Sequence, residues 1–415
     1  MLVQDYQSRK INVQTFFNYT FLILIITQNI WISVLRISNI YTTIAVSLIL
    51  SIFFALLAKQ NYLKLMKTPP VLFWAIWVIY NYVNWKMIGI VNSDNPLQFV
   101  LASFVYPIMT MSIVYFEGRK NLRKTTLVVL VALAIYVMLG LLLQSDNGLP
   151  PNALGDSRGG NILGNALPLN ACMMTFFAVV ANVKGWISKK WLIALLAISL
   201  ASIFFVATRK ALGGWGIIVA MSFFTGFKLN KPSDFLKVLF LLVAFYLAYN
   251  YVMEDTYLGE RLADTEEQGE ESNQTNVKEL NYLGDRAMQY ALGWELFLEN
   301  PISGIGLQNF QIVADFPFMI HSEYIVQICE CGLIGAILYL LFIGGIIVKV
   351  VKNYNKKNSK VFFVCIGGIL CILFINFTAW TYQGNAYFAM YGLILAVCYH
   401  EKKKKLGIAI PSKQK

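Results

Sequence analysis

The chain has 415 residues, of which 57% are apolar and only 13% are charged, and its formal net charge is +12. Soluble domains carry about 25% charged residues. This composition excludes an ordinary soluble enzyme and indicates an integral membrane protein.

Twelve apolar runs predict transmembrane helices, because the hydrocarbon core of a bilayer needs about 20 apolar residues per helix. The runs are 13–35, 40–58, 70–90, 97–116, 124–143, 164–183, 190–208, 211–228, 235–253, 323–350, 360–380 and 384–400. The runs at 70–90, which contains Lys86, and at 211–228, which is rich in glycine, are the two weakest. The first run lacks a small-residue cleavage pattern, so we interpret it as a retained span and not as a signal peptide.

The basic residues predict the orientation of the chain in the membrane. When the connections are counted from a cytoplasmic N-terminus, 26 of the 34 lysines and arginines fall on the cytoplasmic side. This is the positive-inside pattern, and it predicts that both termini are cytoplasmic. The positive charge is therefore a topology signal, and we expect no nucleic-acid partner.

The predicted fold is an all-α, polytopic membrane protein of about 12 transmembrane helices with a large extracytoplasmic loop. Residues 1–253 would hold helices one to nine, 254–322 the loop, and 323–415 the last three helices with a basic cytoplasmic tail. Within the loop, 264–279 is polar and acidic, as linkers are. Residues 286–298 place apolar side chains at helical spacing, which predicts an amphipathic helix at the outer membrane surface. Asn300-Pro301 should end that helix.

Three arginines on separate external segments are candidate anion ligands. Arg158 lies in a glycine-rich loop, Arg209 lies between two apolar runs, and Arg286 heads the amphipathic helix. An arginine within a span costs about 2.5–3.5 kcal/mol on insertion scales, so Arg209 needs either a partner or a path by which it snorkels to the surface. Arg158 and Arg286 are also compatible with plain surface charges. Since the planar guanidinium suits phosphate, the three together predict a shared pyrophosphate clamp.

His321 is the candidate general base. It opens the segment His321-Ser322-Glu323-Tyr324 at the end of the large loop. An unperturbed histidine titrates near pH 6.5 and can accept a proton near neutral pH. The alternative interpretation is an interfacial or helix-capping histidine. The other histidine, His400, stands beside Glu401 and four lysines, which predicts a solvated helix end.

Other chemistry is not indicated by the sequence. In a regular helix Glu330 would lie opposite His321, so we expect it to be a buried carboxylate paired within the bundle. All six cysteines fall in predicted spans, so no disulfide framework is expected. No phosphate-loop motif supports ATP-driven transport, and no external Asp, Glu and His have metal-ligand spacing. We therefore expect neither a metal nor another cofactor.

The stretch from Arg286 to Leu340 resembles the O-antigen ligase and O-antigen polymerase superfamily of bacterial membrane glycosyltransferases. It reads RAMQYALGWELFLENPISGIGLQNF and then, after a short gap, HSEYIVQICECGLIGAILYL. The shared pattern is an arginine-headed helix with a tryptophan, then N-P-x-x-G-x-G, then His-[Asn/Ser]-x-aromatic, then Glu-x-Gly-x-x-Gly. All of these parts stand here in order. Ser322 stands where the ligases often have asparagine, which weakens the ligase-specific interpretation.

The resemblance implies a glycosyltransferase of the bacterial inner membrane whose active site faces the periplasm. Such enzymes take a glycan from an undecaprenyl-pyrophosphate carrier and pass it to a sugar hydroxyl, on lipid A–core or on another carrier-linked unit. The catalytic histidine of the family corresponds to His321. Its donor-binding arginines correspond to Arg209 and Arg286, and Arg158 matches less securely. The implied reaction is an inverting, metal-independent displacement.

Two alternatives stay open at this point. A polysaccharide polymerase would use the same donor, so only the acceptor distinguishes it from a ligase. A transporter or flippase for lipid-linked glycans would also suit twelve spans with both ends inside. It is disfavoured because no repeat symmetry is visible and few charges lie deep in the spans.

Overall fold

The computed structural model of the chain describes residues 13–33, 40–57, 67–89, 96–145, 162–206, 208–224, 284–316, 319–353 and 359–406. Every regular element in these ranges is a helix, as the all-α prediction requires. The expected ninth span, 235–253, and the acidic linker at 264–279 lie outside the described residues.

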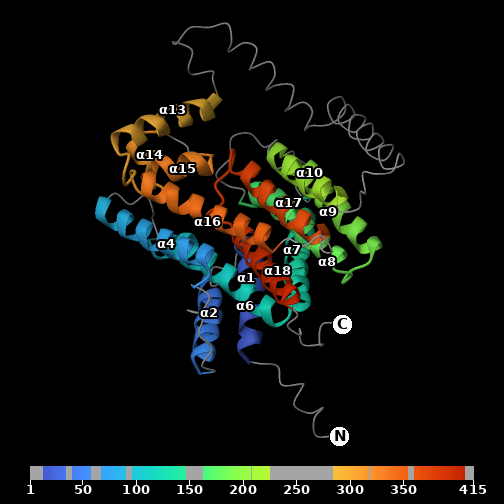
Figure 1. Cartoon of the computed structure of the whole chain (residues 1–415). Helices are drawn as coiled ribbons and strands as arrows, with labels where there is room; N and C mark the ends of the chain where they lie inside the picture. The colour runs from blue at the N-terminus through green and yellow to red at the C-terminus, as the bar shows by residue number, and fades with distance from the viewer. Residues whose placement is uncertain are drawn as a thin grey trace, which may run out of the picture.

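The helices follow the apolar runs of the sequence in order (Figure 1). Their bounds are α1 Val13–Ser33, α2 Ile40–Leu57, α4 Pro69–Ile88, α5 Pro96–Val100, the π-helix η2 Leu101–Val105, α6 Tyr106–Lys120, α7 Leu122–Ser145, α8 Ile162–Val183, α9 Lys189–Val206, α10 Arg209–Phe224, α13 Gly284–Glu299, α14 Phe310–Val313, α15 Glu323–Cys329, α16 Gly332–Lys352, α17 Ser359–Ile375 and α18 Asn385–Lys405.

Five helical stretches in the described part of the chain are long and apolar enough to cross a membrane. They are Leu101–Lys120, Leu122–Leu142, Ala166–Val183, Lys189–Val206 and Gly332–Lys352. Shorter apolar helices lie at Thr42–Leu56 and Lys360–Ile375. The chain is therefore a multi-pass membrane protein, and the full count of twelve spans stays a prediction.

Helix α18 lies at the centre of the bundle, buried without interruption from Asn385 to Cys398. It packs along α6, where a Cβ added to Gly392 would come within 2.5 Å of the Met111 carbonyl oxygen. Small residues let membrane helices approach this closely. His400, near the end of α18, is also buried, and its Nε2 lies 2.9 Å from the Gly118 carbonyl oxygen of α6. The prediction that His400 lies at a solvated helix end is therefore wrong. The histidine packs where α18 crosses α6, while the lysines after it extend outward.

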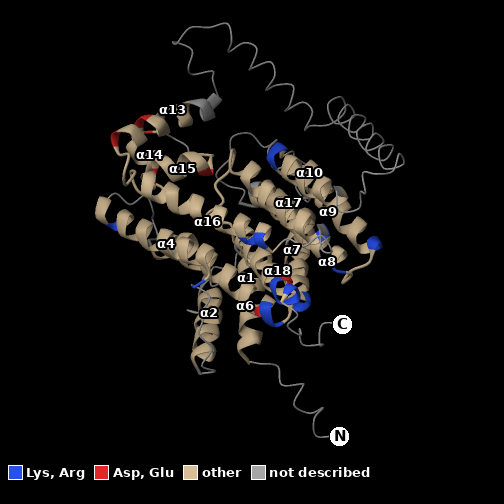
Figure 2. Ribbon diagram, in the orientation of Figure 1, with Lys and Arg blue, Asp and Glu red and all other residues tan. Residues whose placement is uncertain are grey.

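Charge is distributed unequally between the two ends of the bundle. Figure 2 shows lysines and arginines gathered around the lower ends of α6 and α18, while Asp and Glu colour α13 and α15 at the upper end. The end of α18 supplies Lys402, Lys403, Lys404 and Lys405, and the end of α6 supplies Arg119 and Lys120. A second basic spot marks the upper end of α10, which begins with Arg209 and Lys210.

The expected tenth span is divided in two. Helix α15 ends at Cys329, and α16 begins at Gly332. The helix is broken between them, and Gly332 has a left-handed backbone conformation with φ +65°. The regular helix that would have put Glu330 opposite His321 therefore does not exist. The break accommodates the turn after α13: Leu333 N–H donates to the Pro301 carbonyl at 2.8 Å, and Gly306 N–H donates to the Glu330 carbonyl at 2.9 Å.

Candidate active site

The segment 321–323 leads into α15 and is tied to α13. His321 is half-buried, and its backbone N–H donates to Oε1 of Gln289, 3.1 Å away on α13. Ser322 stands at the N-cap in extended conformation, and its hydroxyl donates to the Asn376 carbonyl at 3.2 Å. The backbone of His321 is thus held by α13, and the next residue is held by Asn376.

Glu323 anchors the start of α15 inside the protein. Its side chain is fully buried and accepts hydrogen bonds from the Gln327 amide at 2.8 Å and from the backbone N–H groups of Thr381 and Tyr382, the latter at 3.2 Å. The membrane-spanning stretch that follows in the chain is Gly332–Lys352, so the Glu323 carboxyl lies outside it. Burial raises the pKa of Glu323, and the three donors offset part of that rise.

These contacts converge on the connection between α17 and α18, residues 376–384. The Asn376 carbonyl also accepts the Glu323 N–H at 2.9 Å. The Thr381 hydroxyl donates to Oδ1 of Asn376 at 2.8 Å, so the connection is braced internally. Buried polar groups that satisfy one another in this way hold a single arrangement, because each unmade bond would leave a desolvated group.

Helices α10 and α13 also contact the connection between α17 and α18. Nζ of Lys210 lies 3.5 Å from the Thr378 carbonyl, and the Tyr290 hydroxyl donates to the Phe377 carbonyl at 2.7 Å. Arg209 precedes Lys210 as the exposed first residue of α10. In Figure 1 the beginnings of α10, α15 and α18 accordingly lie toward the same end of the bundle as α13.

The predicted residues are therefore brought together in part. The start of α10, through Lys210, and the His321 segment, through Ser322, both contact the 376–384 connection. Arg209 is the residue before Lys210. The backbone of Arg286 lies in the first turn of α13, the helix that carries Gln289, but its side chain lies outside what the structure describes. Arg158 lies outside the described residues.

Glu330 is buried, as predicted, and its carboxyl accepts hydrogen bonds from backbone N–H groups. Its Oε2 accepts the Gln308 N–H at 2.9 Å, and this holds Gln308 in a left-handed conformation with φ 61°. Burial raises the pKa of Glu330 to about 8, and the backbone donors at Gln308 and Phe310 offset part of the rise. The carboxyl therefore shapes the turn between α13 and α14.

Sequence reasoning missed Gln289 and the whole 376–384 connection. A signal for the second was present, because Asn376 and Thr381 are polar residues at the end of the apolar run 360–380. Polar groups inside membrane spans pair with one another or mark functional sites. Gln289 offered no such signal, since a glutamine on an amphipathic helix is ordinary.

The arrangement combines a titratable imidazole with a cation-bearing helix start at one end of a membrane bundle. A histidine there can accept a proton, and Arg209 and Lys210 can attract an anionic group. Among the described residues, no group of three or more His, Cys, Asp and Glu is placed to hold a metal ion.

Comparison with known proteins agrees with the resemblance carried by the motifs. No curated protein matches the chain. Residues 172–340, a segment that includes Arg209, Arg286 and His321, match the family model described as O-Antigen ligase. That match confirms the resemblance to the O-antigen ligase superfamily over residues 172–340.

Proposed function

We propose that this protein is an O-antigen ligase-like glycosyltransferase that moves a glycan from an undecaprenyl-pyrophosphate donor to a sugar hydroxyl of lipid A–core. The active site would face the periplasm at the outer surface of the inner membrane. The observation that supports the proposal is the meeting of the His321 segment and the start of α10 on the 376–384 connection. His321 and the start of α10 both lie within the segment that matches the family model, and the connection follows that segment in the chain.

The proposed reaction is a single displacement. The imidazole of His321 takes the proton of the acceptor hydroxyl, and that oxygen forms the new bond to the anomeric carbon of the donor sugar. The bond from this carbon to the pyrophosphate oxygen breaks from the opposite side, so the configuration inverts. The carrier leaves as its pyrophosphate, whose growing negative charge Arg209, Arg286 and Arg158 would stabilise. Because arginines can supply this charge, we expect transfer to need no metal.

The decisive variant is His321→Ala. General-base catalysis contributes about 10²- to 10⁴-fold, so we expect purified His321→Ala to lose transfer by that factor while its unfolding temperature stays near that of the parent. The matched control is His400→Ala, which removes the other histidine, one that contacts Gly118 at the basic end of the bundle. Near-normal transfer by His321→Ala would contradict the proposal, and so would equal losses in the two variants.

A polymerase is the alternative within the family, and the acceptor decides between the two. Purified protein would be given the carrier-linked glycan alone or together with lipid A–core. Longer carrier-linked chains formed without lipid A–core would indicate a polymerase, whereas a product formed only with lipid A–core would indicate a ligase. A flippase would instead translocate the carrier-linked glycan in proteoliposomes and form no new glycosidic bond with either acceptor.

A further inference from the structure

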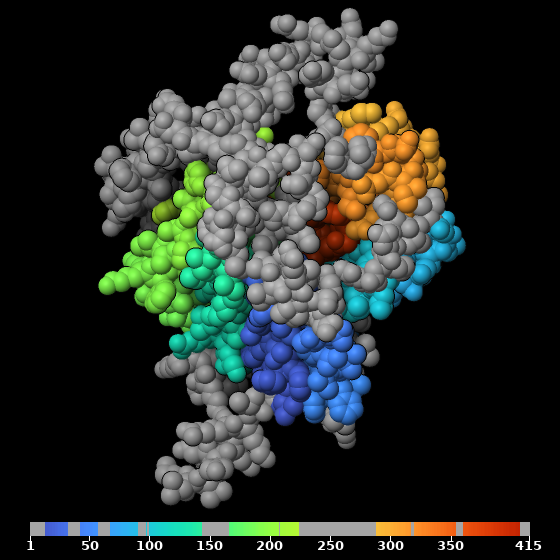
Figure 3. All heavy atoms as spheres, turned by 180° about the vertical axis from the view of Figure 1, so that it is seen from behind, coloured from blue at the N-terminus to red at the C-terminus, as the bar shows by residue number. Residues whose placement is uncertain are grey.

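A cleft of about 390 Å³ opens on the outside of the bundle between α1 and α7. Its wall is apolar and is formed by Ile23 of α1 and by Val128 and Val131 of α7. Figure 3 shows α1 and α7 side by side on this face, and the two helices are in direct contact. Ile23 and Val131 are 38% and 54% exposed, so the wall faces the surroundings of the bundle and not its core.

One end of the same cleft is cationic. Asn121, Arg123 and Lys124 line it at the start of α7. Both basic side chains are exposed, and Nζ of Lys124 lies 5.1 Å from the ring centre of Tyr19 on α1. Oδ1 of Asn121 accepts the Lys124 N–H at 2.9 Å, which fixes the first turn of α7. The cleft thus joins two positive charges to an apolar wall.

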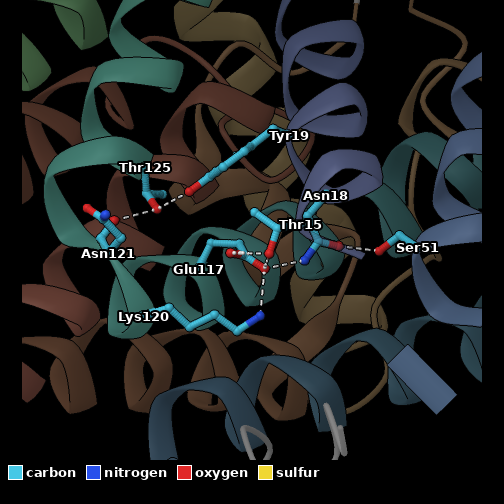
Figure 4. Close-up of polar contacts among 8 residues, drawn as sticks. All are labelled: Thr15, Asn18, Tyr19, Ser51, Glu117, Lys120, Asn121 and Thr125. Atoms are coloured by element: carbon cyan, nitrogen blue, oxygen red, sulfur yellow. Dashed lines mark hydrogen bonds and ion pairs between the residues drawn. The ribbon is translucent and has the colours of Figure 1, made fainter. Parts of the chain in front are cut away.

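The nearby carboxylate does not neutralise these charges. Glu117 is buried and is engaged by Nζ of Lys120 at 3.1 Å and by Nδ2 of Asn18 at 2.6 Å (Figure 4). No ion pair found among the described residues includes Arg123 or Lys124. Lys120 is therefore committed to Glu117, whereas the two cations of the cleft remain available to an external anion.

The cleft also has the right place in a membrane. The stretch Leu122–Leu142 of α7 is long and apolar enough to cross a membrane, which would put Val128 and Val131 at hydrocarbon depth and Arg123 and Lys124 near the membrane surface. A phospholipid has the matching shape, with an acyl chain beside a phosphate. Basic pockets between membrane helices bind anionic headgroups, and each lysine or arginine near an anionic surface adds to the attraction.

We propose that the cleft between α1 and α7 is a binding site for an anionic phospholipid of the leaflet at the basic end of the bundle. Arg123 and Lys124 bind the headgroup phosphate, and an acyl chain lies along Ile23, Val128 and Val131. A zwitterionic lipid fits the wall, but its own cation opposes the two basic residues. The site is separate from the candidate active site and does not depend on the proposed function.

The test compares two double variants of equal charge. Arg123→Gln/Lys124→Gln removes the cations of the cleft, and Lys189→Gln/Lys190→Gln removes two exposed lysines from the first turn of α9, another candidate span. Retained phosphatidylglycerol and phosphatidylcholine would be counted by native mass spectrometry of the full chain released from mixed nanodiscs. We expect the ratio of retained phosphatidylglycerol to phosphatidylcholine to fall at least about tenfold in the cleft variant and to stay unchanged in the α9 variant. Equal behaviour of the two variants would overturn the proposal.

A third variant tests the apolar wall with both charges in place. Val131→Trp adds bulk at an exposed position of the wall and should also remove the retained phosphatidylglycerol, because the acyl chain loses its place. Soluble glycerophosphoglycerol, which has the headgroup without chains, should not compete with the lipid. Full lipid retention by Val131→Trp, or full competition by the soluble headgroup, would show that a surface anion site is present and that the lipid cleft is wrong.

Discussion

Two buried carboxylates, Glu323 and Glu330, shape the candidate site through backbone amides. Each accepts N–H groups from a neighbouring connection: Thr381 and Tyr382 donate to Glu323, and Gln308 donates to Glu330. The sequence correctly predicted that Glu330 is buried but suggested a partner within the helix bundle. It could not indicate a backbone partner, since every residue type except proline supplies an N–H and the position of that N–H depends on how distant turns pack.

Glu330→Gln should flatten the dependence of stability on pH. The pKa of Glu330 is raised to about 8 in the folded protein, above the ordinary value of 4.5, so the folded state binds the proton more tightly. Stability from this group is therefore fully present below about pH 4.5 and is lost as pH rises toward 8. Glutamine keeps an acceptor oxygen for the Gln308 N–H but cannot ionise.

Thermal unfolding in detergent at pH 5 and pH 9 measures this effect. We expect the parent to lose several degrees of unfolding temperature at pH 9 relative to pH 5, and Glu330→Gln to lose clearly less. Some dependence on pH should remain in the variant, because burial also raises the pKa of Glu323. An unchanged pH profile in Glu330→Gln would show that Glu330 is ionised in the folded state at neutral pH.

At the scale of elements, the apolar runs and the helical spacing of one loop segment predicted where most of the described helices lie, but not where one is interrupted. The apolar spacing of 286–298 predicted α13, which runs from Gly284 to Glu299 and ends before Asn300-Pro301 as expected. The run at 323–350 was predicted as one span although Glu323, Gln327 and Glu330 lie in its first third, and composition alone did not place the break at Glu330 and Cys331. The break exists because the turn after α13 packs against it, and that is a tertiary contact.

Gly332→Ala should damage this junction. Gly332 has φ +65°, a conformation that costs an L-residue about 1–2 kcal/mol, and an added Cβ would lie 2.5 Å from the Gly304 backbone nitrogen. We expect the unfolding temperature to fall by at least several degrees, together with transfer activity. Gly344→Ala is the matched control on the same helix, because a Cβ there meets no atom within 4 Å. Since alanine favours a helix over glycine, the control should be neutral or stabilising, and equal losses in both variants would contradict this account.

For the whole molecule, the sequence predicted the all-helical membrane class and the resemblance to the O-antigen ligase superfamily, but not how distant segments meet. The roles of the candidate site residues stay predictions. Alternating apolar runs and clustered lysines indicate a multi-pass bundle because the bilayer imposes both patterns. The meeting of α10, α13 and α15 at 376–384 depends on packing between segments far apart in the chain. No local sequence pattern encodes such a meeting. In the sequence, only the resemblance to the ligase superfamily connected Arg209 with His321.

Arg209→Lys tests whether this meeting point holds the donor. Lysine keeps the positive charge at the start of α10 but loses the planar fork that binds phosphate through two hydrogen bonds. A lost charge-assisted hydrogen bond of about 1.5–3 kcal/mol corresponds to roughly a 10- to 100-fold weaker affinity, so we expect weaker donor binding and slower transfer at low donor concentration. Titration of the purified protein with undecaprenyl-pyrophosphate-linked glycan measures the affinity directly.

Arg119→Lys is the control for that titration. Arg119 lies at the end of α6, where its guanidinium stacks over the Tyr399 ring at 4.3 Å, so the same substitution there also removes a fork and keeps a charge. It belongs to the basic end of the bundle, away from the 376–384 connection, and should leave donor affinity unchanged. If Arg209→Lys binds the donor as tightly as Arg119→Lys does, Arg209 acts by charge alone or lies outside the donor site. The pyrophosphate clamp would then have to be sought around Arg286 and Arg158.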